Sequence, residues 1–333
     1  MTETPPSLLR RTPKVLAAAL RRALAPGVLL LFLAVNLGAA LVLVMPVRSL
    51  LAAELDDNLY GDEMATGASW RWFHTVERQH PRSVGDYGAW TALLSDDGVD
   101  WSDLRQLSGT PAAVALAALL LFLLHAPLHV GWLTVRRRYE AQVGARVGAV
   151  VSAALARAPA ALALALLAAV AYAAAYALAF VAPAGWLRSI SEGMQSERLD
   201  LVFTALRLAL TLVSLFAVKL AFDLAKVALA AGSGWNLVRA VAVAGRELRR
   251  RGVLYALLYA PPAFATVGLS LLWWWTAGGL VPAAWLGLAI LFALQQAFVV
   301  ARIALRLTAL GAAQGLYEEA ATRARMIAPS TTL

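Results

Sequence analysis

The residues of this sequence most able to do chemistry are polar side chains that interrupt long apolar runs. His125 and His129 are four residues apart, so a helix places them one turn apart on one face, with Pro127 between them. Imidazoles at this spacing can ligate a metal ion or a haem iron. Residue counting puts Asn36 and Gln295, from two other apolar runs, at a similar depth. The first candidate set is therefore a polar network of Asn36, His125, His129 and Gln295.

This network has several interpretations. The ordinary one is that its side chains hold helices together by hydrogen bonds within a membrane, and we favour it. The alternatives are a proton path and a ligand pocket. A metal or haem site is less favoured, because two imidazoles are too few ligands and no carboxylate lies where it could complete the set. We therefore predict no metal and no cofactor.

A second candidate set is ionic. Lys219, Asp223 and Lys226 are spaced by four and three residues, which places them on one face of a helix. Arg302 and Arg306, in the last apolar run, have a similar spacing and a similar predicted depth. We expect an ion pair between Asp223 and one of these two arginines, joining two helices. The alternative is that each charged side chain extends separately to the lipid headgroups.

Long apolar runs must position these side chains. The chain has 333 residues, of which 61% are hydrophobic and 15% are charged, whereas about 25% of the residues of soluble domains are charged. A hydrocarbon core is crossed by a helix of roughly 20 apolar residues. We therefore predict an all-α, polytopic transmembrane helix bundle with six spans. These spans are residues 27–47, 111–135, 160–183, 201–231, 253–276 and 281–307.

The distribution of arginine predicts the orientation of the bundle. Arginines gather in residues 1–26, 136–159 and 232–252, whereas residues 48–110 are acidic. Because cytoplasmic segments carry the excess of basic residues, we predict that both termini are cytoplasmic. Arginine greatly outnumbers lysine, which is typical of a GC-rich bacterial genome, so we predict the bacterial inner membrane. The remaining segments are an outer loop at 184–200, an outer turn at 277–280 and a cytoplasmic tail at 308–333.

Net charge and missing motifs limit the partners and the chemistry. The net charge of +9 is concentrated on the predicted cytoplasmic rim, where it would attract the anionic headgroups of the lipid bilayer. No soluble basic domain accompanies it, so we predict no nucleic-acid partner. The chain has no cysteine, which excludes disulfides and thiolate ligands. It also lacks the P-loop, G-x-G-x-x-G, H-E-x-x-H and G-x-S-x-G signatures.

Three segments resemble one another: residues 14–31, 146–163 and 236–258. Each has an amphipathic stretch, then arginine, then an apolar run that begins near proline or glycine. This pattern predicts amphipathic helices lying on the cytoplasmic surface, each leading into a transmembrane hairpin. The alternative is that the three segments are similar only because the whole chain is rich in alanine, leucine and arginine.

Residues 48–110 form the one sizeable segment outside the predicted spans. Their length is near the lower limit for an independent core without disulfides. We therefore expect a small extracytoplasmic helical cap that packs on the outer ends of the spans. His74 and His80 are six residues apart with Glu77 between them, which is poor spacing for metal ligands on one helical face. A solvated acidic cap is favoured over a metal site.

Short motifs carry a resemblance to a family. The run Phe222-Asp223-Leu224-Ala225-Lys226, followed by a basic amphipathic segment, is similar to an aromatic-Asp-Tyr-Ala-Arg/Lys pattern. That pattern closes the fourth span in a family of uncharacterised bacterial six-span integral membrane proteins. Leu224 departs from the usual tyrosine. Residues 296–317 and 64–67, the latter followed by two tryptophans, resemble the same group. The resemblance implies six helices with cytoplasmic interfacial helices, and it implies no activity.

These observations favour a non-enzymatic accessory or scaffold component of a bacterial inner membrane, with a membrane protein as its partner. The alternative is a transporter or permease-like subunit that works through the polar network at the midplane. A lipid enzyme ranks third, because such a site would cluster Asp, His or Glu at an interface.

Overall fold

The computed structural model describes residues 5–55, 110–138, 147–183, 197–232, 236–279 and 285–327. Within these ranges the secondary structure is helical and no strand occurs, so the prediction of an all-α fold is confirmed. Five of the described helices are long and apolar enough to cross a membrane, and a sixth span is counted if the bent helix pair at the N-terminus is one span. The described architecture is that of a multi-pass membrane protein.

Long helices make up most of the fold. Alanine and leucine dominate their sequences, and both are strong helix formers. A helix also satisfies its own backbone hydrogen bonds, as hydrocarbon requires. The long helices are α2 (Pro26–Leu55), α7 (Thr110–Arg138), α9 (Ala158–Tyr176) with its π-helical continuation η1 (Ala177–Val181), α11 (Glu197–Ala231), α12 (Leu237–Gly279) and α13 (Trp285–Ile327). Two shorter helices are α1 (Pro5–Ala23) and α8 (Val147–Ala156).

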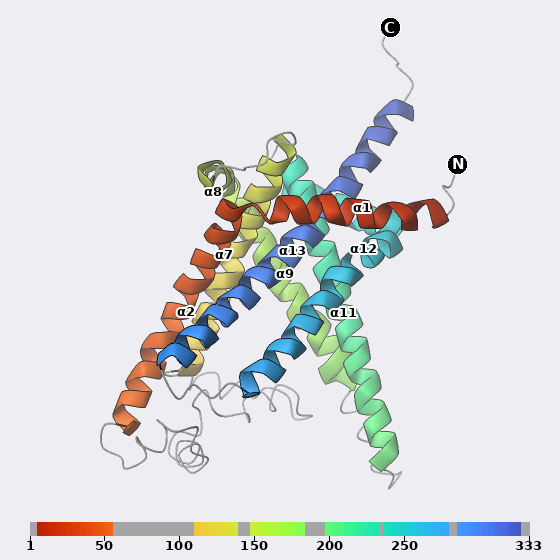
Figure 1. Cartoon of the computed structure of the whole chain (residues 1–333). Helices are drawn as coiled ribbons and strands as arrows, with labels where there is room; N and C mark the ends of the chain where they lie inside the picture. The colour runs from red at the N-terminus through yellow and green to blue at the C-terminus, as the bar shows by residue number, and fades with distance from the viewer. Residues whose placement is uncertain are drawn as a thin grey trace.

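The two short helices lie at one end of the long ones (Figure 1). There α1 crosses the bundle and packs on α13, and α8 packs on α7. The start of α1 and the end of α13 are at this same end, and the long helices spread apart toward the other (Figure 1). We call it the α1 end.

Each of the three similar segments contains a break in its helix. The axes of α1 and α2 differ by 70° across the break between them. Between α8 and α9, Arg157 leaves the helical conformation with φ −117° and ψ 7°. Within α12, Arg251 has φ −139° and ψ 20°. The breaks therefore recur where a basic stretch meets an apolar run in each of the three segments. Two of the following helices begin with an early proline, which favours the first turn of a helix.

The core is densest near the α1 end. The side chains of Trp132 and Leu133 on α7 and of Leu307 and Leu310 on α13 are fully or almost fully buried. At Gly131, a Cβ atom would lie 2.5 Å from the carbonyl oxygen of Val150, so a glycine lets α8 approach α7. Farther from this end, large apolar side chains are exposed on several helices, which suits a surface that faces lipid.

Several expected boundaries differ from the helices. Helix α13 continues without interruption to Ile327, so residues 308–327 of the expected cytoplasmic tail prolong the helix of the sixth expected span. The connector 232–252 is largely helical as the first part of α12. The expected cap, including His74 and His80, lies mostly outside the described residues, as do most of the outer loop 184–200 and part of the turn 277–280.

Candidate functional site

Three of the four predicted network residues come together between α2 and α7. The amide nitrogen of Asn36 lies 3.3 Å from Nε2 of His125 and also donates to the carbonyl oxygen of Phe32, at 2.7 Å. The ring of Phe32 packs against both imidazoles, with its centroid 5.6 Å from that of His125 and 5.1 Å from that of His129. The imidazole centroids are 5.6 Å apart. His129 is buried, and its Nδ1 has no hydrogen-bond partner among the described residues.

Gln295 is the exception. Its side chain is exposed on α13, whereas the asparagine and the histidines are at least partly buried. The expectation that Gln295 joins a buried network at the midplane is therefore corrected. Residue counting gives depth along a helix, but it does not give the direction in which the side chain points.

The ionic set forms within one helix. Asp223 is buried, and its two carboxylate oxygens each contact a lysine of α11: Oδ2 is 2.8 Å from Nζ of Lys219 and Oδ1 is 2.8 Å from Nζ of Lys226. These spacings of four and three residues are those that the sequence indicates. In the described ranges the carboxylate has no ion pair with Arg302 or Arg306. The structure thus pairs Asp223 along its own helix instead of across to α13.

The two candidate sets nevertheless meet. Helix α11, which carries Asp223, packs on α7, which carries the two histidines, and on α13, which carries Arg306. The Nζ atom of Lys219 lies 5.0 Å from the ring centroid of Tyr259 on α12. Arg302 points elsewhere, with its guanidinium 5.5 Å from the ring of Phe298. We call the assembled group the polar cluster: His125, His129, Lys219, Asp223, Lys226, Tyr259 and Arg306.

The polar cluster carries more positive than negative charge. Three of its side chains are cationic, and Asp223 is its one carboxylate. An ionised side chain within a transmembrane helix is costly unless it is paired. Contact with Asp223 offsets this cost for the two lysines, because the Nζ atom of each lies 2.8 Å from a carboxylate oxygen. The guanidinium of Arg306 has no hydrogen bond or ion pair to another residue that the structure describes, and its side chain is exposed.

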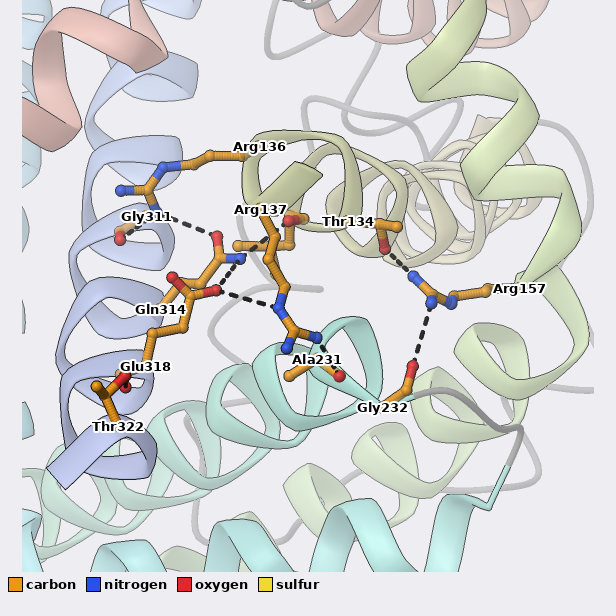
Figure 2. Close-up of polar contacts among 11 residues, drawn as sticks. Thr134, Arg136, Arg137, Arg157, Ala231, Gly232, Gly311, Gln314, Glu318 and Thr322 are labelled. Carbon is orange, nitrogen blue, oxygen red and sulfur yellow. Dashed lines mark hydrogen bonds and ion pairs between the residues drawn. The ribbon is translucent and has the colours of Figure 1, made fainter. Parts of the chain in front are cut away.

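A second charged site lies at the α1 end, and Figure 2 shows it. Helix α11 ends there with carbonyl groups that have no partner within the helix. Arg137 of α7 donates to the carbonyl oxygen of Ala231. Arg157, at the break before α9, donates to the carbonyl oxygen of Gly232 at 3.2 Å and to the hydroxyl of Thr134. Positive charge at a helix C-terminus is also favoured by the helix dipole.

The same site joins α7 to α13 (Figure 2). Arg136 donates to the carbonyl oxygen of Gly311 and, at 3.1 Å, to Oε1 of Gln314. The buried Gln314 donates in turn to the carbonyl oxygen of Leu133 at 3.0 Å and to Oε1 of Glu318 at 3.1 Å. That carboxylate lies 3.7 Å from Nε of Arg137. We call this site the arginine junction: Arg136, Arg137, Arg157, Gln314 and Glu318.

Sequence reasoning missed the arginine junction as a site. It treated these arginines as markers of orientation and did not consider Gln314 or Glu318. The sequence holds a weak signal of this site, because Gln314 and Glu318 are polar residues four positions apart that follow Gly311. A Cβ atom at Gly311 would lie 2.9 Å from Nη1 of Arg136, so the glycine makes room for the arginine.

Neither site has the ligands of a metal centre. Among the described residues, no group of three or more His, Asp or Glu side chains could hold a metal ion. The side chains of the two sites can join helices by hydrogen bonds and ion pairs. Those of the polar cluster also concentrate positive charge.

Comparison with protein-family models, curated proteins and solved structures found no match. The resemblance to bacterial six-span proteins therefore stays a prediction, and function has to be argued from the contacts.

Proposed function

We propose that the protein is a non-enzymatic scaffold of a bacterial inner membrane, with six spans and both termini in the cytoplasm. The arginine junction is the observation that carries this proposal. Its bonds connect α7, α11, α13 and the break between α8 and α9 at one end of the bundle. Hydrogen bonds to charged groups are stronger than those between neutral groups. The junction therefore fixes the relative positions of these helices where α1 and α8 pack.

The orientation in this proposal is supported by the same end of the bundle. Arginines mark the cytoplasmic side of membrane proteins, and the junction takes three of them. The helix α1 buries Ala19 and Ala23 while Arg21 and Arg22 stay exposed. A helix with this division suits the plane of the interface, where its arginines meet anionic headgroups. We assign the same place to α8 and to the first part of α12.

The scaffold would bind a second membrane protein on the helices that the arginine junction holds in place. The test is purification of the tagged full-length chain from native membranes in mild detergent. A stoichiometric membrane-protein partner is expected, and Arg157→Gln should reduce its recovery because that change loosens the junction. His125→Ala, in the polar cluster, should leave recovery unchanged. Recovery that falls with His125→Ala and not with Arg157→Gln would contradict the proposal.

The second candidate is a transporter or permease-like subunit, and the polar cluster favours it. Histidines, lysines and a carboxylate within apolar helices are common in proton and substrate pathways. This candidate predicts a proton or solute flux in reconstituted vesicles that His129→Phe abolishes while the protein remains folded. A flux equal to that of empty vesicles would count against it.

A further inference from the structure

The unbalanced charge of the polar cluster points to a missing anion. Lys219 and Lys226 share the single carboxylate of Asp223, with both contacts at 2.8 Å. Arg306 adds a third positive charge from α13, which packs on α11. Excess charge in an apolar environment is unfavourable until a counter-ion neutralises it.

The cluster is also accessible. About a third of the Lys219 side chain is exposed (34%), although the carboxylate it contacts is almost fully buried (2%). The side chain of Arg306 is exposed on α13. Asp223 thus holds the lysines in place from inside, while Lys219 and Arg306 can be reached by a ligand from outside the bundle.

The donors suit a phosphate group. A guanidinium binds phosphate oxygens with paired N–H groups, and an ammonium binds them as a point charge. We propose that Arg306, together with Lys219 and Lys226, binds the phosphate of an anionic phospholipid from the inner leaflet. The inner leaflet in this statement rests on the orientation given under the proposed function.

Position along the helices favours a lipid as the source of that phosphate. Lys226 precedes Ala231 of the junction by five residues, and Arg306 precedes Gly311 by five, which is about 7.5 Å along a helix. The cluster therefore lies slightly below the arginine-rich rim, within reach of a headgroup. Exposed apolar side chains on α11 and α12, including Leu212, Leu257 and Phe264, offer a surface for acyl chains.

Native mass spectrometry of the purified full-length chain tests the proposal with phosphatidylglycerol, phosphatidylcholine and inorganic phosphate as probes. Phosphatidylglycerol should be retained in preference to phosphatidylcholine. Arg306→Gln should weaken this binding about tenfold, the loss of one charge-assisted contact. The matched control is Arg302→Gln, one turn away on the same helix, whose guanidinium lies over Phe298. This control should bind phosphatidylglycerol like the wild type.

Three outcomes would overturn the proposal: unchanged binding by Arg306→Gln, equal loss with Arg302→Gln, or displacement of the lipid by inorganic phosphate. Arg306→Lys guards against a folding defect, because it keeps the charge and should keep the preference for phosphatidylglycerol. A lipid-dependent rise in Tm provides a second measurement, expected for the wild type and Arg306→Lys and absent for Arg306→Gln. The result is independent of whether a protein partner co-purifies, so the scaffold proposal and this one can fail separately.

Discussion

The arginine junction and the polar cluster both join helices through charged side chains, but they neutralise charge in different ways. At the junction, Arg136, Arg137 and Arg157 donate mainly to neutral carbonyl and amide oxygens. In the cluster, the lysines contact a carboxylate. The side chain of Arg137 is 44% exposed, whereas that of Asp223 is 2% exposed.

The difference follows from the surroundings of each site. Near water, neutral oxygens and one more distant carboxylate are enough to hold the arginines, because solvent screens the charge that remains. Within apolar helices the same cation needs a formal counter-ion. The junction should therefore tolerate the loss of one charge better than the cluster does. The following substitutions test that comparison, beginning with the largest expected effect.

Asp223→Asn should be the most destabilising change. It leaves Lys219 and Lys226 without their shared counter-ion inside the bundle. Removing one partner of a buried ion pair typically costs about 3–5 kcal/mol. Thermal unfolding in detergent should show a large fall in Tm. Adding Lys219→Gln to the variant should recover part of the loss, and a Tm unchanged by Asp223→Asn alone would show that the cluster is not held by its carboxylate.

Arg157→Gln should have a smaller effect. It removes donations to the carbonyl oxygen of Gly232 and the hydroxyl of Thr134, and hydrogen bonds to charged groups contribute about 1.5–3 kcal/mol. The same unfolding assay measures it. The control is Arg246→Gln, an exposed arginine of α12, which should leave Tm unchanged. A fall in Tm larger than that caused by Asp223→Asn would contradict the expectation that the junction tolerates the loss of a charge better than the cluster does.

Gly131→Ala tests the packing beside the junction. Its added Cβ would lie 2.5 Å from the carbonyl oxygen of Val150 and 2.7 Å from the backbone nitrogen of Ala154. Because backbone atoms cannot move aside as a flexible side chain can, α8 must shift, at a typical cost of about 1–3 kcal/mol. Gly148→Ala is the control, since nothing lies within 4 Å of its added Cβ. Equal stability of the two variants would contradict the close contact between α7 and α8.

Asn36→Ala should have the smallest effect. It removes one hydrogen bond to His125, and such bonds between membrane helices are worth about 0.6 kcal/mol on average. Gln295→Ala, at the exposed position on α13, should have no effect on Tm. A larger loss from Gln295→Ala than from Asn36→Ala would restore Gln295 to the network.

Local features could be predicted from the sequence, because helical periodicity determines them. The apolar runs predict the helices, and the spacing of Lys219, Asp223 and Lys226 predicts that they share a face. The pairing of His125 with His129 is local in the same sense. Each of these requires knowledge of one helix alone.

Contacts between helices could not be predicted in the same way. Residue counting places Arg302 and Arg306 within about one turn of each other. It does not show that the guanidinium of Arg302 lies over the ring of Phe298. Half of the partners of the junction arginines are backbone carbonyls, which are present at every residue and leave no mark in a sequence. Rotation about the helix axis and the choice of backbone partner both depend on tertiary packing.

The most direct test of the central claim is the accessibility of single cysteines, because the chain has none of its own. Ser152 is exposed on α8 at the α1 end, Ser191 lies in the expected outer loop, and Ser270 is exposed within the apolar part of α12. Each is replaced by cysteine and treated with a membrane-impermeant maleimide in spheroplasts.

In intact spheroplasts we expect Ser191→Cys alone to be labelled, with Ser152→Cys joining it after permeabilisation. Ser270→Cys should stay unlabelled until detergent is added, since lipid covers it. Labelling of Ser152→Cys in intact spheroplasts would contradict the orientation, and rapid labelling of Ser270→Cys without detergent would contradict the membrane-embedded bundle itself.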